Sequence, residues 1–256
     1  MISKNKLKEL AAYRLQKRCD EEAVFVVEGP KMASEALASG FTVRVVCATS
    51  DWLTASAGAC FGDAEVHEVS PVELERLSHF KTPNQVWMLV ERPLPKDLKD
   101  SQSLTLALDR IQDPGNLGTM LRTADWYGVR HVVCSRDTAS CYNPKVVQAS
   151  MGAIFRTQVD YVDLPQWLAA CGTPVYGASL HGKPLPEVAT ADVDAVLLIG
   201  NESRGISPEA MAQVTHPVLI PNLGGTAESL NASVATGILM NYLLWNNCNI
   251  TKEEQR

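Results

Sequence analysis

Short apolar runs alternate with amphipathic segments along most of the chain, and this alternation constrains the fold more than any other feature. Short, mostly apolar runs of three to five residues bounded by turn residues are typical of buried strands. In the second half of the chain such runs occupy residues 104–108, 131–134, 158–162, 175–178, 195–199 and 218–220. Helical patterns separate them, and strands joined through helices pair in parallel. The sequence therefore predicts an α/β unit with a mostly parallel sheet.

The first ninety residues show the same alternation. Leu7, Leu10, Ala11 and Leu15 recur at three- and four-residue steps, which predicts one amphipathic helix over 4–19. Strands are expected at 23–27, 43–48, 66–69 and 86–90, with helices between them at 30–39, 52–57 and 72–77. We expect a small α/β sandwich here, again with a largely parallel sheet.

A polar segment divides these two halves. Residues 92–103 read RPLPKDLKDSQS, with two prolines, mixed charges and little apolar content. Such composition is typical of a linker. We place the boundary near residue 97, which gives an N-terminal domain at 1–97 and a C-terminal domain at 98–256. A chain of 256 residues is long enough for two modest domains.

Composition excludes several classes of protein. Apolar residues make up 46% of the chain and charged residues 20%, which suits a folded globular protein. No run of eighteen apolar residues occurs, and no apolar core follows the basic N-terminus, so we expect neither a membrane span nor a secretory signal. Seven cysteines lie widely scattered without C-x-x-C spacing. This pattern suits a reducing compartment, predicts a cytoplasmic protein and argues against a metal site.

The distribution of charge is more informative than its total. The net charge is −6, yet residues 1–18 hold six basic residues against Glu9 alone, a local charge of +5. A basic helix on an acidic protein favours a local phosphate-binding patch. The alternative is an ordinary solvated helix face, and charge alone does not separate the two.

Three loops follow apolar strands and precede helices, at 109–116, 200–207 and 221–229. In open parallel sheets the loops at the carboxyl ends of the strands converge on the ligand site. Each of these loops carries an asparagine, so they are the best candidates for chemistry. The first loop lacks the G-x-G-x-x-G pattern of dinucleotide binding, and no Walker lysine is present. A hydride-transferring enzyme is therefore disfavoured.

Three ordered segments resemble the motifs of the SpoU/TrmH family of RNA ribose 2′-O-methyltransferases, in the SPOUT class. They are Asn116 to Ala124 (N-x-G-x-x-x-R-x-A), Ile199 to Gly205 (I-G-N-E-x-x-G) and Ile220 to Ala235 (I-P, then S-L-N-x-S-x-A). The resemblance covers about residues 104–245. The N-terminal part looks like the small substrate-binding domain, similar to RNA-binding ribosomal proteins, that often precedes this catalytic domain.

The resemblance implies a C-terminal segment threaded through a deep trefoil knot, S-adenosylmethionine as cofactor and a homodimer with its site at the subunit interface. A knot is outside the reach of sequence rules, which assume that connections do not thread. Carried over residue by residue, the implied cofactor-binding positions are Ala178, Ser179, Gly200, Asn201, Ile220 and Leu230.

The implied catalytic residues are Asn116, Arg122, Glu202, Ser229 and Asn231. A guanidinium holds its proton far above neutral pH, so we expect Arg122 to clamp the target phosphate and stabilise developing oxyanion charge. The alternative is an ion pair with an acid such as Asp125. For Asn116, Ser229 and Asn231 the alternative is helix capping, which is compatible with a role in the site.

Two residues of the second motif raise separate questions. Glu202 is expected to orient Asn116, Arg122 or a loop amide, the alternative being a solvated loop acid. Ser203 replaces the glycine that the family commonly has after the Asn-Glu pair, and this departure bears on how the loop bends.

The sequence thus predicts an S-adenosylmethionine-dependent RNA ribose 2′-O-methyltransferase, with ribosomal RNA as first choice of substrate because the two-domain layout resembles the rRNA-modifying branch. Transfer RNA is the second choice. The other hypotheses are a non-catalytic RNA-binding protein of the same fold and a methyltransferase of substrates other than nucleic acid.

Overall fold

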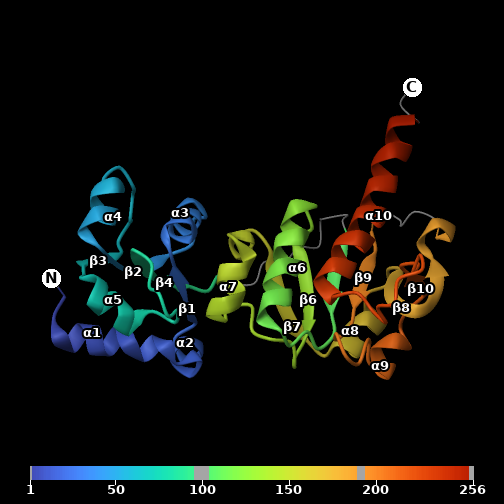
Figure 1. Ribbon diagram of the computed structural model, residues 1–256, viewed down its shortest axis with the longest axis horizontal. Helices are drawn as coiled ribbons and strands as arrows, with labels where there is room; N and C mark the ends of the chain where they lie inside the picture. Colours follow the sequence, from blue (N-terminus) through green and yellow to red (C-terminus); the bar gives the residue numbers. More distant parts are fainter. Residues whose placement is uncertain (1, 95–103, 189–193, 254–256) are drawn as a thin grey trace. The chain divides into compact units, whose positions relative to one another are not determined.

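The computed structural model describes residues 2–94, 104–188 and 194–253, and it divides the chain into two compact units (Figure 1). The first unit comprises Met1–Leu94 and Tyr142–Phe155, and the second comprises Pro95–Cys141 and Arg156–Arg256. The boundary predicted near residue 97 lies outside the described residues. The segment Tyr142–Phe155 belongs to the first unit, although the predicted division places it in the C-terminal domain.

The sheet of the first unit has four strands in the order β1-β4-β2-β3. They are β1 (Val24–Glu28), β2 (Val43–Ala48), β3 (Glu65–Glu68) and β4 (Val86–Glu91). The pairs β1–β4 and β2–β4 are antiparallel, and β2–β3 alone is parallel. The predicted largely parallel sheet is therefore wrong for this unit. The last strand, which is buried along almost its whole length, inserts between the first two, and strand order is not encoded in local alternation.

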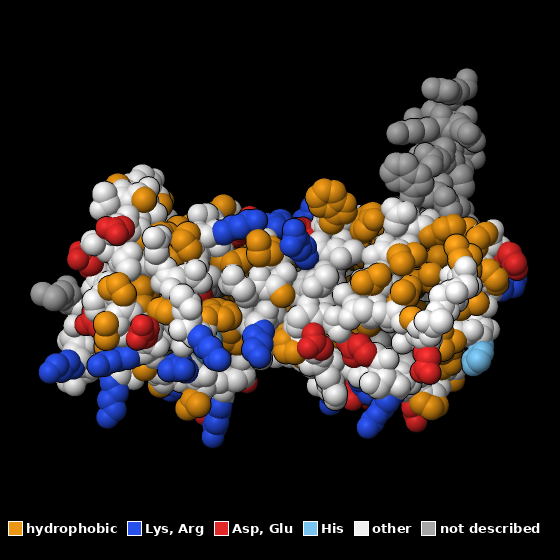
Figure 2. All heavy atoms as spheres, viewed as in Figure 1, with side chains coloured by type: hydrophobic (Ala, Val, Ile, Leu, Met, Phe, Trp, Pro, Cys, Tyr) orange, Lys and Arg blue, Asp and Glu red, His pale blue; other side chains and the backbone are white. Residues whose placement is uncertain are grey.

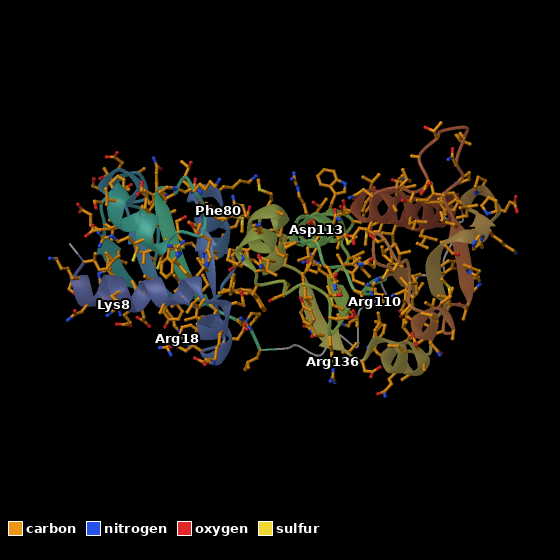
Figure 3. All side chains as sticks on the ribbon, turned by 60° about the horizontal axis from the view of Figure 1, so that its bottom comes forward. Lys8, Arg18, Phe80, Arg110, Asp113 and Arg136 are labelled. Atoms are coloured by element: carbon orange, nitrogen blue, oxygen red, sulfur yellow. The ribbon has the colours of Figure 1, made fainter. Side chains whose placement is uncertain are left out.

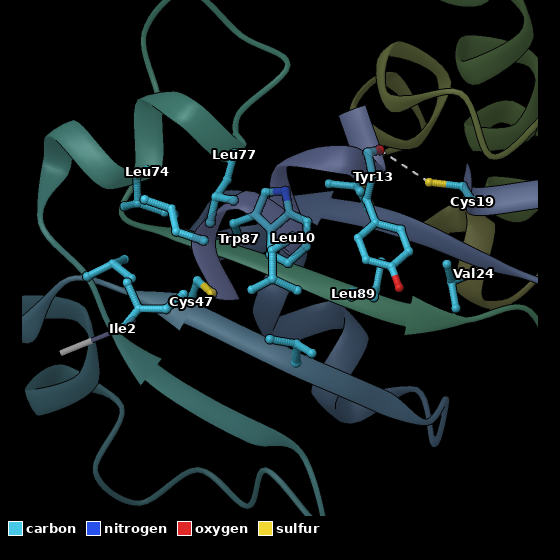
Figure 4. Close-up of a cluster of buried hydrophobic side chains, with 14 residues drawn as sticks. Ile2, Leu10, Tyr13, Cys19, Val24, Cys47, Leu74, Leu77, Trp87 and Leu89 are labelled. Atoms are coloured by element: carbon cyan, nitrogen blue, oxygen red, sulfur yellow. Dashed lines mark hydrogen bonds between the residues drawn. The ribbon is translucent and has the colours of Figure 1, made fainter. Parts of the chain in front are cut away.

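Helices flank this sheet. The predicted single helix over 4–19 is instead α1 (Lys4–Ala11), a 3₁₀ turn η1 (Ala12–Arg14) and α2 (Gln16–Glu21), because Leu15 adopts an extended conformation with φ −89° and ψ 119°. Figure 4 shows how Leu10 of α1 meets Leu74, Leu77 and Trp87 in one buried cluster. The remaining elements of this unit are α3 (Pro30–Ala38), α4 (Ser50–Ala55), α5 (Pro71–Leu77), α7 (Pro144–Ser150) and η2 (Ala153–Phe155).

The second unit is built on a six-stranded sheet in the order β10-β8-β9-β5-β6-β7. Its strands are β5 (Thr105–Leu108), β6 (His131–Ser135), β7 (Gln158–Val162), β8 (Val175–Pro184), β9 (Val196–Ile199) and β10 (His216–Leu219). Every neighbouring pair is parallel, so the predicted parallel sheet is confirmed here. The central strands β5 and β9 are the most buried, as their continuous apolar runs require.

Helices cover this sheet: α6 (Pro114–Trp126), α8 (Leu164–Ala170), α9 (Pro208–Met211) and α10 (Ala232–Glu253), with η3 (Leu185–Glu187) as a short turn. Leu164 and Leu168 of α8 pack with Ala107 and Val133 of the sheet. Residues alternate between the two faces of a strand, so Leu106 and Leu108 serve the other face. Among the described residues, no helix is both long and apolar enough to cross a membrane.

The packing of α10 on α6 positions the third predicted loop. A Cβ placed on Gly237 of α10 would lie 3.9 Å from Cγ2 of Thr123 in α6, an ordinary contact distance. The hydroxyl of Tyr127 donates a hydrogen bond of 3.1 Å to Oδ1 of Asn241. The small residues of α10 thus serve close packing within one chain, and this packing brings the start of α10 to the start of α6.

Candidate active site

Three side chains, one from each of the three motifs, form one hydrogen-bonded chain at the carboxyl edge of the parallel sheet. Nδ2 of Asn116, in the first turn of α6, donates to Oε1 of Glu202 after β9 at 2.7 Å. Nδ2 of Asn231, which precedes α10, donates to Oδ1 of Asn116 at 3.0 Å. The structure therefore brings together residues that are separated by as many as 115 positions in the sequence.

Asn116 is available for this role because another residue caps its helix. The sequence pattern places the helix start at 117, whereas α6 begins at Pro114 with Asp113 as its N-cap. Oδ1 of Asp113 accepts the backbone N–H of Asn116 at 2.7 Å. Capping, the alternative role for Asn116, is therefore wrong, and its side chain is left for Glu202 and Asn231.

Asn231 does two things at once. Its Oδ1 accepts hydrogen bonds from the Ser233 backbone at 2.9 Å, the Ser233 hydroxyl at 2.6 Å and the Val234 backbone at 3.3 Å, which caps α10. Because backbone N–H groups only donate, this end of the amide must be the oxygen, and the NH₂ group must face Asn116. The direction of both hydrogen bonds follows: Asn231 donates to Asn116, and Asn116 donates to Glu202.

The loop after β9 is closed on itself. The backbone of Asn201 exchanges hydrogen bonds of 3.0 and 2.9 Å with Gly205. Its side-chain oxygen accepts the backbone N–H groups of Ser203 and Arg204, and its Nδ2 donates to the carbonyl of Arg110 at 2.9 Å. Ser203 is not among the described residues with positive φ, so its replacement of glycine leaves this turn intact. The Asn201 side chain is thus committed to shaping the loop.

Gly200 meets the same loop at close range. A Cβ on Gly200 would lie 2.2 Å from the carbonyl carbon of Gly205 and from the nitrogen of Ile206. No real Cβ approaches a backbone that closely, so only glycine lets the loop turn back against the end of β9.

The residues implied for the cofactor lie on β8 where its register with β10 shifts, and just after the ends of β9 and β10. Gly177 of β8 pairs with Leu198 of β9 and with Pro217 of β10. The register of the β8–β10 pair then shifts, since the next pair is Val218 with Lys183, and residues 178–182 are left without a partner in β10. Ala178 and Ser179 therefore start an unpaired stretch beside Gly200, and Ile220 follows β10.

Leu230 belongs to the exposed segment 222–231, which Asn222 organises. Oδ1 of Asn222 accepts the backbone N–H groups of Gly224 and Gly225, and Nδ2 donates to the carbonyls of Gly225 and Ala227. Within the described part of the chain, the backbone of Leu230 has no hydrogen-bond partner. Free backbone groups beside half-buried apolar residues fit an adenine ring and an amino-acid moiety, so this set suits S-adenosylmethionine.

Two predicted catalytic residues stand apart from the hydrogen-bonded chain. Ser229 is exposed and, among the residues that the structure describes, has no hydrogen-bond partner. Arg122 is exposed on α6, about 9 Å along the axis from Asn116 and about 120° around it. Across the described ranges Arg122 forms no ion pair, and Asp125 instead accepts Nε of Arg156 at 2.9 and 3.1 Å. The predicted alternative, an Arg122–Asp125 pair, is therefore wrong.

Sequence reasoning missed three residues at this edge of the sheet. Besides Asp113, these are buried Asp109, whose Oδ2 accepts the backbone N–H of Ser207 at 2.6 Å, and Arg110, whose φ is +58°. Both Arg110 and Asp113 lie on the segment that leaves β5 (Figure 3). The Asp-Pro pair at 113–114 is a helix-start signal and could have identified the cap. No local signal identifies Asp109 or the backbone of Arg110.

Comparisons with known proteins bear on this arrangement. Residues 103–241 match the SpoU rRNA Methylase family, and residues 4–87 match the MRM3-like substrate binding domain. The chain is 30% identical to the 23S rRNA (guanosine(2553)-2'-O)-methyltransferase RlmP of Bacillus subtilis, over 93% of this chain and 95% of that protein.

Solved structures agree along nearly the whole chain. A putative RNA methyltransferase of the TrmH family from Porphyromonas gingivalis is 39% identical, with a TM-score of 0.85 over 96% of this chain and 99% of that one. An AdoMet-bound rRNA methyltransferase from Sinorhizobium meliloti is 27% identical, with a TM-score of 0.81 over 95% of each chain. With the motifs assembled at one edge of a parallel sheet, the chain belongs to the SpoU rRNA Methylase family.

Proposed function

We propose that this protein transfers a methyl group from S-adenosylmethionine to the ribose 2′-hydroxyl of ribosomal RNA. The observation that carries the proposal is the Glu202–Asn116–Asn231 chain, since it assembles one residue from each of the three family motifs with fixed donors and acceptors. The relatives support the substrate class, because RlmP is a 23S rRNA 2′-O-methyltransferase and the two proteins match over 95% of its length.

In this proposal the cofactor is held by the middle of β8 and by the segments that follow β9 and β10. Backbone groups of Gly200, Ile220 and Leu230 would contact it, Ala178 and Ser179 would line the pocket, and Asn201 would keep the loop in shape. When bound, the cofactor supplies an electrophilic methyl group on a sulfonium sulfur. The residues of this chain have to hold the ribose hydroxyl in line with that group and stabilise the charge that develops on its oxygen.

The hydrogen-bonded chain and Arg122 divide that work. Asn116 is held at both ends, so its amide is rigid and acts as a positioning group at the mouth of α6. Arg122 carries a full positive charge with no partner among the described residues, which leaves its five N–H donors for a phosphate or a developing oxyanion. Because a guanidinium keeps its proton, Arg122 acts electrostatically.

The first unit supplies RNA affinity in this proposal. Lysine and arginine side chains gather along the edge of this unit that carries α1 and α2 (Figure 2). Part of that charge is neutralised, since Lys6 pairs with Glu65 at 2.8 Å and Arg18 pairs with Glu22. Lys4, Lys8 and Arg14 are exposed and, within the described ranges, unpaired. These three residues favour the phosphate-binding interpretation of the basic segment over a merely solvated face.

The knot and the dimer are further parts of this proposal. The chain runs from β10 at the edge of the sheet back to α10, which contacts α6 and β9, and a threaded path in this stretch is the arrangement of the SPOUT class. Trp126, Val234 and Ile238 leave 84%, 50% and 37% of their surfaces exposed on α6 and α10. An apolar face of this kind suits a second copy of the chain. We place the enzyme in the cytoplasm, where bacterial rRNA is modified.

The test is methyl transfer from labelled S-adenosylmethionine to total rRNA and, separately, to total tRNA, with Arg122→Ala as control. Label in rRNA that the variant loses is the expected result. Label in tRNA alone would replace the substrate class. Cofactor binding with transfer to neither pool would favour a non-catalytic RNA-binding protein, and absence of cofactor binding would overturn the enzyme proposal altogether.

A further inference from the structure

A polar cavity of about 440 Å³ lies beside the loop that follows β9. Its lining includes Arg110 after β5, Asp137 after β6, and Glu202 and Arg204 after β9. The same carboxylate of Glu202 that accepts Asn116 thus forms one wall of the cavity. All of these residues belong to the second unit, so the cavity is a feature of one compact body.

The acceptors of this cavity are partly engaged. Oδ1 of Asp137 accepts the hydroxyl of Ser135 at 2.7 Å, and Oε1 of Glu202 accepts the amide of Asn116 at 2.7 Å. The side-chain oxygen of Asn201 accepts two backbone N–H groups of its own loop. Each carboxylate keeps its second oxygen without a partner among the described residues, so two acceptor oxygens remain on this wall.

The donors, by contrast, are in surplus. Nε of Arg110 is buried and forms no hydrogen bond, although it approaches Oδ1 of Asp109 to 3.5 Å. The guanidinium makes one long bond, from Nη2 to the carbonyl of Gly205 at 3.5 Å. The exposed side chain of Arg204 has no partner in the described part of the chain. A ligand with several acceptor oxygens and negative charge matches this inventory.

The backbone of Arg110 supports a role in binding. With φ at +58° it adopts the left-handed conformation that residues with a Cβ rarely take. The backbone N–H of Arg110 donates to Oγ of Ser135 at 2.8 Å, and its carbonyl accepts a hydrogen bond from Nδ2 of Asn201 at 2.9 Å. Ser135 at the end of β6 and Asn201 in the loop after β9 therefore hold this arginine in a strained conformation, and such strain is typical of functional sites.

We infer that this cavity binds a backbone phosphate of the RNA, through the guanidinium groups of Arg110 and Arg204, next to the nucleotide whose ribose is methylated. The inference rests on the proposed function and adds two binding residues to it. A guanidinium matches the oxygens of a phosphodiester in a bidentate way. Glu202 stands between the cavity and Asn116, so a phosphate held here lies beside the hydrogen-bonded chain that positions the ribose.

The experiment measures binding of transcribed, unmodified 23S rRNA to the full chain at several salt concentrations, together with the KM for RNA and the Kd for S-adenosylmethionine. The variants are Arg110→Asn, because asparagine tolerates left-handed backbone, and Arg204→Gln on an exposed side chain. Arg130→Gln is the matched control, since it removes one exposed charge at the opposite, amino end of β6.

Each lost phosphate contact makes the negative slope of log K against log salt less steep by about 0.7 to 0.9. We expect that fall for Arg110→Asn and for Arg204→Gln, a rise of about tenfold in the KM for RNA, and an unchanged Kd for the cofactor. Arg130→Gln is expected to leave the slope and both constants unchanged.

The outcomes separate the inference from the function on which it rests. If the wild-type protein neither binds the cofactor nor methylates RNA, the proposed function fails. If the wild type is active and both variants keep its salt slope and KM, the phosphate site is wrong while the function stands. Weaker cofactor binding in either variant, with an unchanged salt slope, would also overturn the inference, because the cavity would then serve the cofactor loop.

Discussion

Nδ2 of Asn231 donates a hydrogen bond of 3.0 Å to Oδ1 of Asn116, and this contact joins the start of α10 to the start of α6. The oxygen of Asn231 is engaged by the first turn of its own helix, so the amide cannot reverse without losing its cap. Because Oδ1 of Asn116 accepts from Asn231, its NH₂ group must face Glu202. Two helix starts and one loop are thereby held in one arrangement by groups that can act only as donors or only as acceptors at each step.

The polarity of this chain can be tested by reversing one link. Asn116→Asp keeps the acceptor for Asn231 but places a carboxylate oxygen against the carboxylate of Glu202, where the two like charges repel. We expect a loss of about 10²-fold to 10³-fold in kcat and a drop of roughly 1–3 kcal/mol in the free energy of unfolding. The double variant Asn116→Asp with Glu202→Gln restores a donor–acceptor pair, because the glutamine NH₂ faces the new carboxylate.

Chemical denaturation of the two single variants and the double variant measures this coupling. Recovery of most of the lost stability in the double variant is the expected result. Additive losses in the double variant would show that Asn116 and Glu202 do not interact as described.

Arg122 separates catalysis from stability. The side chain is exposed and has no partner among the described residues, so Arg122→Ala should change the free energy of unfolding by no more than about 0.5 kcal/mol. The same variant should lower kcat/KM by about 10²-fold to 10³-fold, because a preorganised charge is lost. Arg122→Lys keeps the charge without the planar fork, so its kcat/KM should lie between that of the wild type and that of Arg122→Ala. A single ionisation near neutral pH in the rate profile, abolished by Arg122→Ala, would contradict a purely electrostatic role.

Gly200 tests the loop that shapes the cofactor site. In Gly200→Ala the new methyl would lie 2.2 Å from the backbone of Gly205, so the loop has to move away from the end of β9. We expect weaker binding of S-adenosylmethionine by isothermal titration, by at least about tenfold, and a lower Tm. Gly58→Ala is the control, because a Cβ there meets nothing within 4 Å. Wild-type cofactor affinity in Gly200→Ala would mean that this turn is not part of the site.

Ile238 tests the proposed dimer. Glutamate at an exposed position of α10 costs a monomer little, whereas an unpaired carboxylate buried between two copies costs about 3 kcal/mol, or roughly a hundredfold in the dissociation constant. Sedimentation velocity should therefore show wild-type dimers and Ile238→Glu monomers. Val72→Glu changes an apolar side chain of the first unit that is 60% exposed and should leave the association state unchanged. A wild-type monomer at micromolar concentration would remove the basis for the dimer.

Cysteine reactivity should follow burial. Cys60 is exposed, whereas burial raises the pKa of the Cys47 thiol to about 12. At pH 8 only about one in ten thousand Cys47 side chains is then a thiolate, and thiolate is the reactive form. When the protein reacts with a thiol reagent, the fastest-reacting cysteine should be missing in Cys60→Ser. Cys47 should react only after unfolding. Fast modification of Cys47 in the folded protein would contradict this burial.

From the sequence we predict the strands of both units, the mostly parallel second sheet and the three motifs with their asparagines. These features are local: an apolar run, a turn residue and a helix start are each written in neighbouring positions. The division of roles between Asp113 and Asn116 was also within reach, because Asp-Pro is a stronger helix-start signal than the asparagine two residues later.

The remaining features depend on how distant segments pack together. β4 lies between β1 and β2, although the edge strand β1 is equally buried, and this choice between pairings is encoded in no single segment. The direction of the Asn231–Asn116–Glu202 chain depends on which amide end a distant helix cap engages. Arg110 is held in left-handed backbone by Ser135 at the end of β6 and by Asn201 in the loop after β9. Local propensity sets what each segment can form, and hydrogen bonds between segments far apart in the chain select which of those forms the protein adopts.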